Sequence, residues 1–171
     1  MDKQTLSQIA AQIGTPSFVF DETALAARMR EIKAIVGDSV HLCYSIKANP
    51  FLIPAMQKAT ELLEVCSPGE LTICEDVGVD CSTILFSGVN KTLEDIEHAM
   101  NAGVIRFTAE SPMHIRLLEQ AAAKRDRVYP VLLRLTAGTQ FGMDESDLRS
   151  AIAHKENYPH LDFVGDRKSV V

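Results

Sequence analysis

The sequence lacks several features that mark other classes of protein. Positive charge is not in excess, because 17 lysine and arginine residues stand against 23 aspartate and glutamate residues, for a formal net charge of -6. This balance argues against a nucleic-acid surface, which needs clustered basic residues. No apolar run approaches the roughly 18 residues that cross a bilayer, and Asp2 stands where a signal peptide carries positive charge. We therefore expect a cytoplasmic protein without a membrane or nucleic-acid partner.

Cysteine and glycine motifs are missing as well. The four cysteines form no C-x-x-C pair, and no histidine lies near them at ligand spacing, so neither a zinc site nor a disulfide framework is indicated. No G-x-G-x-x-G follows the first predicted strand, and G-x-x-x-x-G-K-[ST] is absent throughout. The sequence therefore lacks the main motifs that would indicate a nucleotide-binding open sheet. We expect buried free thiols at Cys43, Cys66, Cys74 and Cys81.

What the sequence does contain is an alternation of short aliphatic runs with stretches of helical period. A chain of 171 residues, 46% of them hydrophobic, is long enough for one domain with a sizeable core. Successive strand and helix units predict a parallel sheet, because parallel neighbours need a crossover helix. A doubly wound open sheet and a (β/α)₈ barrel both fit, and the missing glycine motifs favour an α/β fold with about six of the eight barrel strands. The predicted strands are residues 17–20, 40–47, 62–65, 83–88, 104–110, 128–135 and 160–165.

Three helices carry clear boundary signals in the sequence. Asp21, Thr92 and Ser111 each precede a stretch of helical period and are predicted N-caps, because their side-chain oxygens can accept a hydrogen bond from a free backbone N–H group. Gly37 and Gly103 are predicted to end the first two of these helices.

The stretch CYSIKANP ends an apolar run with a single lysine, Lys47. Alternation along a strand puts Cys43, Ser45 and Lys47 on one face. In a barrel, chemistry gathers at the carboxyl ends of the strands. A crowded amine there loses proton affinity and can attack a carbonyl, which suits it to bond an aldehyde such as pyridoxal phosphate. Spacing alone would favour a solvated lysine with no special role.

The segment YSIKANP resembles the Y-[AS]-[VIL]-K-A-N motif of a pyridoxal-phosphate-dependent family. The family, of fold type III, includes diaminopimelate, ornithine and arginine decarboxylases and shares its barrel with alanine racemase. Further matches follow in the family's order: LEVCSPGEL, FSGVNKT, AGVIRFTAES, LLRL and QFGMD. The resemblance covers about residues 15–165, and it implies the N-terminal part of such an enzyme, with the C-terminal β-domain missing.

The resemblance also implies a division of the chain. Residues 1–20 would be a helix and a strand associated with the missing β-domain, and residues 21–165 would be an incomplete pyridoxal-phosphate-binding barrel. Residues 166–171, DRKSVV, stand where the family continues as G-[IVL]-H, and their codons can be written to resemble a sequencing adapter. We interpret them as a non-native tail. With two open sheet edges, we expect the isolated chain neither to fold stably nor to decarboxylate a substrate.

The same resemblance assigns roles to individual residues. Lys47 would form the covalent bond with the cofactor aldehyde, and Ser45 and Ser87 match small residues that line the cofactor pocket. Glu64 stands where the family usually has an aspartate near the cofactor ring, and the alternative is a carboxylate that faces water. Arg134 would approach the cofactor, because burying it among apolar residues requires an anionic partner. A structural salt bridge with Glu64 or another acid at the barrel mouth is the alternative.

In the complete protein, the resemblance implies decarboxylation of a small amino acid or diamino acid, as in diaminopimelate decarboxylase, by a homodimer. An amino-acid racemase and a non-enzymatic pyridoxal-phosphate-binding homeostasis protein are the alternatives. The segment SFVFD argues against the latter, because it resembles the decarboxylases' contribution to their second domain. Lys91 in GVNKT is a further hint of function, since a positive charge near a helix start is unfavourable.

Overall fold

The structure is a computed structural model that describes residues 1–167. Its backbone contacts divide the chain into two compact units with a boundary after His41. The division after Phe20 that the family resemblance implied stays a prediction.

The N-terminal unit contains two helices, α1 (Lys3–Ile13) and α2 (Glu22–Val36), and none of their residues is buried. The cap predicted for α2 is confirmed, because the Asp21 carboxylate accepts a hydrogen bond of 3.0 Å from the Ala24 backbone N–H. Local capping therefore defines this helix without support from a core.

Residues 17–20 form no strand in the structure, although the sequence analysis predicted one. A strand needs a neighbouring strand to receive its backbone hydrogen bonds, and no strand of the described chain pairs with this segment. The side chain of Phe18 in this segment is fully exposed.

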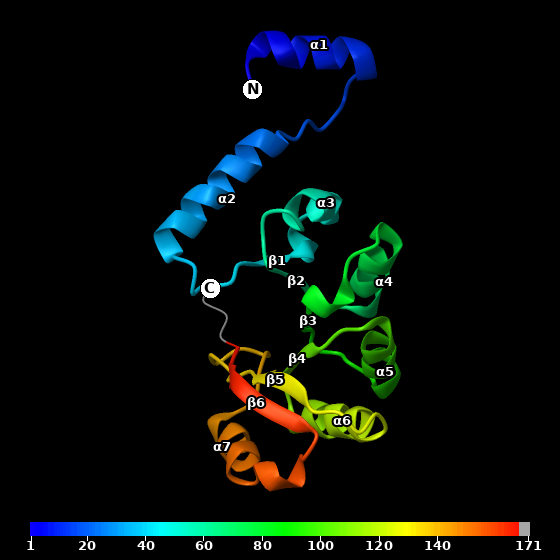
Figure 1. Cartoon of the computed structure of the whole chain (residues 1–171), viewed down its shortest axis with the longest axis vertical. Coiled ribbons are helices and arrows are strands. Elements are labelled where there is room, and N and C mark those ends of the chain that lie inside the picture. Colours follow the sequence, from blue (N-terminus) through cyan, green and yellow to red (C-terminus); the bar gives the residue numbers. More distant parts are fainter. Residues whose placement is uncertain (168–171) are drawn as a thin grey trace. The chain divides into compact units, whose positions relative to one another are not determined.

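The second unit contains six parallel strands that follow one another in chain order, as Figure 1 shows. This arrangement confirms the predicted parallel sheet of an incomplete barrel, in which β1 and β6 are the two edges among the described strands. The strands are β1 (Cys43–Ser45), β2 (Leu62–Val65), β3 (Ile84–Phe86), β4 (Arg106–Ala109), β5 (Tyr129–Leu133) and β6 (Leu161–Asp166).

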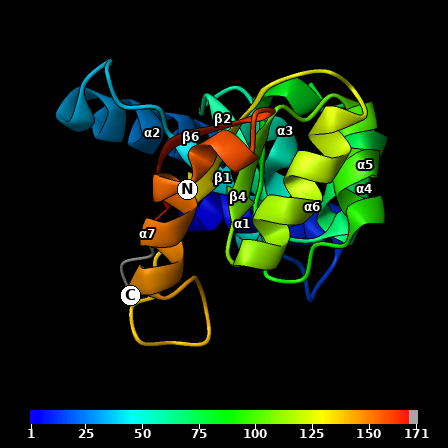
Figure 2. The same cartoon turned by 90° about the horizontal axis from the view of Figure 1, so that it is seen from below.

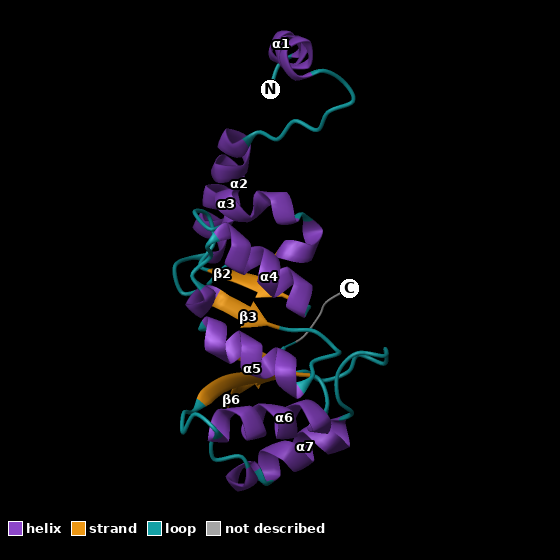
Figure 3. Cartoon of the chain, turned by 90° about the vertical axis from the view of Figure 1, so that its right-hand side faces the viewer, coloured by secondary structure: helices purple, strands orange, loops and turns teal. Residues whose placement is uncertain are grey.

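The helices of this unit connect successive strands, and α4, α5 and α6 lie along one face of the sheet (Figure 3). Helix α7 packs next to α6 and extends this layer (Figure 2). The α-helices are α3 (Ile53–Met56), α4 (Pro68–Val77), α5 (Leu93–Ala102), α6 (Pro112–Ala123) and α7 (Glu145–Ala153). The short 3₁₀ helices are η1 (Ile46–Ala48), η2 (Pro50–Leu52), η3 (Cys81–Thr83) and η4 (Lys155–Asn157).

The first strand of the sheet is shorter than predicted. The sequence indicated a strand over residues 40–47, but β1 ends at Ser45, and Lys47 lies in η1. The turn that follows is held locally, because the Asn49 side chain accepts from the Phe51 N–H at 3.1 Å and its carbonyl accepts from the Tyr44 hydroxyl at 3.0 Å. These bonds favour a turn over continued extension.

The core lies between the sheet and its helices. Burial alternates along β3 and β5, so one face of the sheet is covered and the other is partly open. Phe86, Phe107 and Tyr129 form an aromatic row on neighbouring strands, with ring centroids 6.2 and 5.9 Å apart. Such tilted and edge-to-face pairs are the favoured geometries for aromatic rings.

The predicted boundaries of the core helices are also confirmed. Thr92 caps α5 in a reciprocal arrangement with Asp95, and Gly103 ends this helix at φ 102°. Ser111 caps α6 by accepting from the His114 N–H at 3.1 Å. These positions were identifiable because capping depends on residues three or four positions apart.

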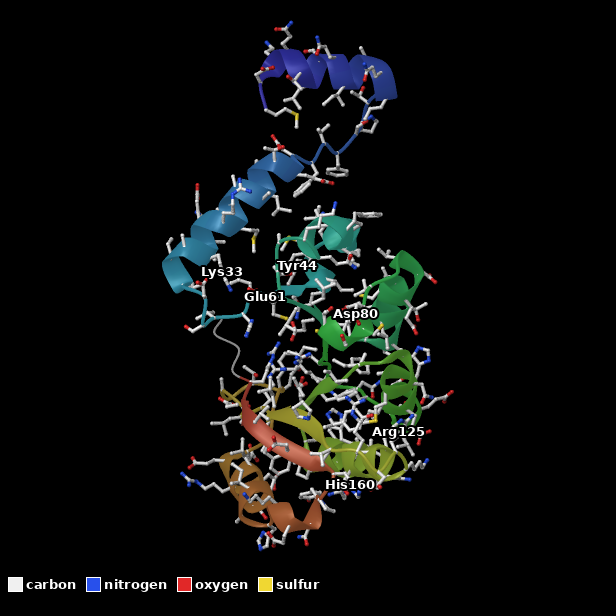
Figure 4. All side chains as sticks on the ribbon, viewed as in Figure 1. Lys33, Tyr44, Glu61, Asp80, Arg125 and His160 are labelled. Carbon is white, nitrogen blue, oxygen red and sulfur yellow. The ribbon has the colours of Figure 1, made fainter. Side chains whose placement is uncertain are left out.

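Side-chain bonds tie the helical layer together at its surface (Figure 4). Arg125 at the end of α6 donates to the Glu97 carbonyl at 3.1 Å, which links α6 to α5. His160 before β6 lies 2.7 Å from the Glu119 carboxylate of α6. These contacts link α6 to α5 and to the segment before β6.

The four cysteines are free, as expected, but they are not all buried. Cys74 and Cys81 are buried and Cys66 is half-buried, whereas Cys43 is exposed because it lies in the edge strand β1. Residues 1–167 contain no cluster of His, Cys, Asp or Glu that could hold a metal ion. Within the same residues, no helix combines the length and apolar character needed to cross a membrane.

Candidate cofactor site

A cavity of about 340 Å³ opens at the carboxyl ends of the strands. Every strand contributes to it by a residue that stands one or two positions after the strand's last residue. Parallel strands end at the same edge of a sheet, so side chains far apart in the sequence meet there. These strand-end residues are Lys47, Cys66, Ser87, Glu110, Arg134 and Arg167.

Lys47 lines this cavity after β1, and its side chain is exposed. Its Nζ lies 3.8 Å from the Cys66 Sγ, and within the described chain it forms no ion pair with a carboxylate. The crowding expected for this amine is therefore not observed, because η1 carries Lys47 away from the sheet. The amine is available to an occupant of the cavity.

Glu64 is buried, so the alternative of a carboxylate facing water is wrong. Its oxygens accept from the Ser45 hydroxyl at 2.7 Å, the Ser87 hydroxyl at 2.8 Å and the Arg167 guanidinium at 2.9 Å. Burial acts to raise the pKa of Glu64, but the hydrogen bonds from Arg167, Ser45 and Ser87 together lower it below its usual value. Glu64 is thus held ionised by Arg167 and by the two serines that the sequence analysis placed in the pocket.

Arg134 lines the cavity after β5 and is largely buried. Its guanidinium donates to the Glu110 carboxylate at 2.5 Å, so the acid at the barrel mouth is Glu110 and not Glu64. The guanidinium also stacks on the Phe141 ring, 4.9 Å from its centroid. Between an ion pair and an aromatic face, the arginine is fixed in one orientation while it still borders the cavity.

Gly88 brings the ends of β2 and β3 close together. It adopts φ 107°, and a Cβ atom at this position would lie 2.3 Å from the Cys66 carbonyl oxygen. Only glycine fits such a conformation and such an approach. The cavity wall next to Lys47 therefore depends on this residue.

Lys91 lies behind the cavity wall and is 3% exposed. Its ammonium donates to the Gly88 carbonyl at 2.5 Å. Burial lowers the pKa of Lys91 to about 8, opposed in part by the negative charge of Glu110. Burial, together with the nearby charge of Lys91, lowers the pKa of His114 to about 4, so this imidazole is neutral near pH 7. A neutral imidazole has a ring nitrogen that can accept a hydrogen bond, and Nδ1 of His114 accepts from the Glu110 backbone N–H at 3.3 Å.

The segment interpreted as a non-native tail takes part in the site through its first two residues. Asp166 is the last residue of β6, one residue beyond the predicted strand. The Arg167 backbone N–H donates to the Leu133 carbonyl at 2.7 Å, and its side chain reaches Glu64. Residues 168–171 lie outside the described residues. That the tail is non-native stays a prediction.

Sequence reasoning assigned no role to several members of the site. It assigned none to Glu110, Cys66 and Phe141, although all three lie in segments quoted for the family, and it left Lys91 as a hint. Glu110 would have been the easiest of these to predict, since it ends the predicted strand 104–110 as Lys47 ends the predicted strand 40–47. The pairing of Glu110 with Arg134 joins residues 24 positions apart, which no local pattern reveals.

Comparison with known proteins identifies relatives of this chain. The family described as "pyridoxal-dependent decarboxylase, pyridoxal binding domain" matches residues 22–158. Diaminopimelate decarboxylase of Zymomonas mobilis is 32% identical over 94% of this chain. The match covers 43% of that relative, so the chain spans less than half of its length.

Solved structures share the fold. Diaminopimelate decarboxylase from M. jannaschii matches 93% of this chain with a TM-score of 0.77 at 22% identity, and the match covers 43% of that structure. Lysine/ornithine decarboxylase from Vibrio vulnificus, complexed with putrescine, matches 96% of this chain and 46% of its own, with a TM-score of 0.78 at 18% identity. These likenesses extend over both the sheet and the helices.

Proposed function

The chain belongs to the pyridoxal-dependent decarboxylase family, and from this premise we propose that the complete protein decarboxylates a small amino acid, with diaminopimelate as the first candidate. Membership confirms the family indicated by the motifs, and with it the expected pyridoxal phosphate cofactor. One observation carries the proposal: the amine of Lys47 and the ion-paired Arg134 border the same cavity at the carboxyl ends of the strands.

The residues of the cavity fit the cofactor. An aldehyde requires an accessible amine, and Lys47 is exposed and has no carboxylate partner among the described residues. A phosphorylated ring requires cationic groups nearby, and Lys47 and Arg134 both line the cavity. When bound, pyridoxal phosphate supplies an electron sink for the electron pair left as carbon dioxide departs.

In this proposal, Lys47 holds the cofactor and can carry a proton at Nζ close to the reacting atoms. Arg134 presents a fixed positive charge toward the cavity, because Glu110 and Phe141 hold its guanidinium. Glu64 supplies a negative charge whose position is set by Ser45 and Ser87. Arg134 and Glu64 are held by their neighbours before any ligand arrives, which favours rapid reaction.

The substrate class rests on the relatives. Curated relatives of this chain include diaminopimelate decarboxylases, and solved structures of similar fold include lysine, ornithine and arginine decarboxylases. We propose an amino acid that carries a second amino group. Release of carbon dioxide from such a substrate would separate decarboxylation from racemisation, in which the substrate is retained with inverted configuration.

The cofactor role of Lys47 can be tested directly. The purified complete protein is incubated with pyridoxal phosphate, reduced with borohydride to make the lysine bond permanent, and digested for mass spectrometry. We expect the cofactor mass on the peptide that contains Lys47, and its loss in Lys47→Ala. Lys58→Ala removes another exposed lysine and serves as the matched control. Equal labelling of Lys47 and Lys58 in the unsubstituted chain would contradict the proposal.

We propose in addition that the complete protein is a cytoplasmic homodimer. The location rests on resemblance to diaminopimelate decarboxylases, which are metabolic enzymes. The dimer rests on family resemblance alone. Sedimentation analysis of the complete protein would show a mass of one protomer if the dimer is wrong.

A further inference from the structure

Lys91 is a charged residue in an unusual place. It follows β3, immediately before the Thr92 cap of α5, and is almost completely buried. Its ammonium donates to the Gly88 carbonyl at 2.5 Å and lies 5.9 Å from the centroid of the Phe86 ring. A buried lysine is costly, and one placed at a helix start gains nothing from the helix dipole. Its position therefore requires an explanation beyond packing.

A short series of contacts connects Lys91 to the cofactor lysine. The ammonium holds the carbonyl of Gly88, and Gly88 packs against the backbone of Cys66 at the limit of close approach. The thiol of Cys66 lies 3.8 Å from the Nζ of Lys47. Displacing Lys91 would loosen the wall against which the Lys47 side chain lies.

The charge of Lys91 matters as much as its contacts. Glu110 and Arg134 form a buried pair that is neutral in sum. Because Lys91 lies within electrostatic reach of Glu110, it gives this group of three side chains a net positive charge. A positively charged wall at the mouth of a cavity favours an anionic occupant.

We propose that Lys91 is a positioning residue that keeps the wall of the cofactor cavity ordered and positively charged, so that the cavity selects a phosphate-bearing ligand. This inference rests on the proposed function. Lys91 does not line the cavity and does not touch the ligand itself. It acts through Gly88 and through the pair of Glu110 and Arg134.

The first test uses the complete protein and its variants and measures binding of pyridoxine 5′-phosphate, which lacks the aldehyde and so binds without a bond to Lys47. At pH 7, Lys91→Met should weaken this binding about tenfold, the effect of one nearby charge. Methionine keeps most of the side-chain volume and removes the cost of burying a charge, so the urea midpoint at pH 7 should not fall below that of the unsubstituted protein. The control Lys58→Met removes an exposed charge and should change neither quantity.

The outcomes separate this inference from the proposed function. If the unsubstituted chain bonds pyridoxal phosphate at Lys47 but Lys91→Met binds pyridoxine 5′-phosphate as tightly as the control, the inference is wrong and the function stands. If affinity and the urea midpoint fall together, Lys91 is merely structural, which also overturns the inference. Absence of bonding at Lys47 in the unsubstituted chain overturns both.

A second test uses the unsubstituted chain alone and does not depend on folding of a variant. The rate of amine acylation at Lys91 is followed by mass spectrometry as a function of pH, with and without pyridoxine 5′-phosphate. We expect a midpoint near pH 8 without ligand, because burial lowers the pKa of this amine, and a higher midpoint with ligand, since an anion stabilises the ammonium. Simple occlusion would slow the reaction without moving the midpoint, and that result would contradict the proposal.

This titration involves every charged or titratable group that faces Lys91. Negative charge on Glu110 and on an ionised Cys66 raises its pKa, and the positive charges of the two arginines lower it. Burial raises the pKa of Cys66, so this thiol keeps its proton near neutral pH. The groups concerned are Glu110, Cys66, His114, Arg134 and Arg167.

Discussion

The covered face of the sheet is apolar, whereas the rim at its carboxyl ends is ionic. The aromatic row of Phe86, Phe107 and Tyr129 lies in the covered layer, and the rim carries Glu64 and Glu110 with their cationic partners. Apolar burial stabilises a fold, but a buried ion pair contributes little net stability because both charges must lose water. The apolar layer therefore supplies most of the net stability, and the rim supplies the ionisable groups.

The largest expected loss of stability is in the covered layer. Phe107→Ala should lower the free energy of unfolding by about 3–5 kcal/mol, because it leaves a cavity among rings that no solvent reaches. Urea unfolding followed by circular dichroism measures this, with an osmolyte added if the baseline is weak. Phe51→Ala removes a ring that is 90% exposed and is the matched control. Equal effects would mean that the covered layer is not the core.

The expectation that the isolated chain does not fold stably stays a prediction. The urea profile of the unsubstituted chain tests it before any variant is compared. A cooperative transition would show that six strands suffice despite two open edges.

Breaking an ion pair of the rim should cost slightly less than opening the core. Arg134→Met leaves Glu110 buried without its partner, and we expect a loss of about 3 kcal/mol, at the lower end for such pairs because Lys91 still supplies positive charge. Arg149→Met, which breaks the exposed pair with Glu145, should change stability by less than about 0.5 kcal/mol. If both variants unfold at the same urea concentration, the buried pair does not stabilise the rim.

The pH dependence of stability reports on the rim as well. The pKa of Lys91 is lowered to about 8 from its ordinary value of 10.5, so the unfolded chain binds more protons between these values. The free energy of unfolding, measured relative to that of Lys91→Met, should then rise by up to about 3 kcal/mol as the pH increases from 8 to 10.5. Below pH 8 this difference should not change with pH.

The comparison with Lys91→Met is needed because the buried thiols have the opposite effect. Burial raises the pKa of Cys74 to about 11, so its contribution to stability falls as the pH rises above the ordinary value near 9. Subtracting the two urea series removes this shared effect. Parallel pH profiles would rule out a lowered pKa for Lys91.

The smallest expected effect lies outside both layers. Thr92→Ala removes the cap of α5 and should cost about 1 kcal/mol, because one backbone N–H loses its partner. Thr72→Ala, at an exposed position within α4, should be neutral or slightly stabilising. The difference in urea midpoint between these two variants measures the cap.

Much of the covered layer was predictable because its signals are local. The strand 62–65 was identified with its observed bounds, and the caps Asp21, Thr92 and Ser111 were all correct. The strand predicted for residues 17–20 was wrong, because an alternating pattern does not ensure that a neighbouring strand is present to pair with it. The parallel sheet and its helix boundaries were therefore predictable from periodicity and capping, whereas the pyridoxal-phosphate-binding barrel rested on the family resemblance. The errors lie where a segment depends on a partner.

Less of the rim was predictable. The sequence placed Ser45, Glu64 and Ser87 in one pocket, and the structure brings them together through the hydrogen bonds of Glu64. The partner of Arg134 could not be chosen from the sequence, since any acid that follows a strand was a candidate. Burial of Lys91 depends on how the loop after β3 closes, and no pattern of neighbouring residues encodes that.

The close approach at Gly88 has a consequence for how this site can change in evolution. Each group on the cavity wall is supplied by a separate connection between a strand and the next helix, so most of them can be exchanged one at a time. Gly88 is the exception, since any larger residue would collide with the Cys66 carbonyl and push two connections apart. Substitutions that adapt the site to new substrates should therefore occur in the other connections, and Gly88 should remain unchanged.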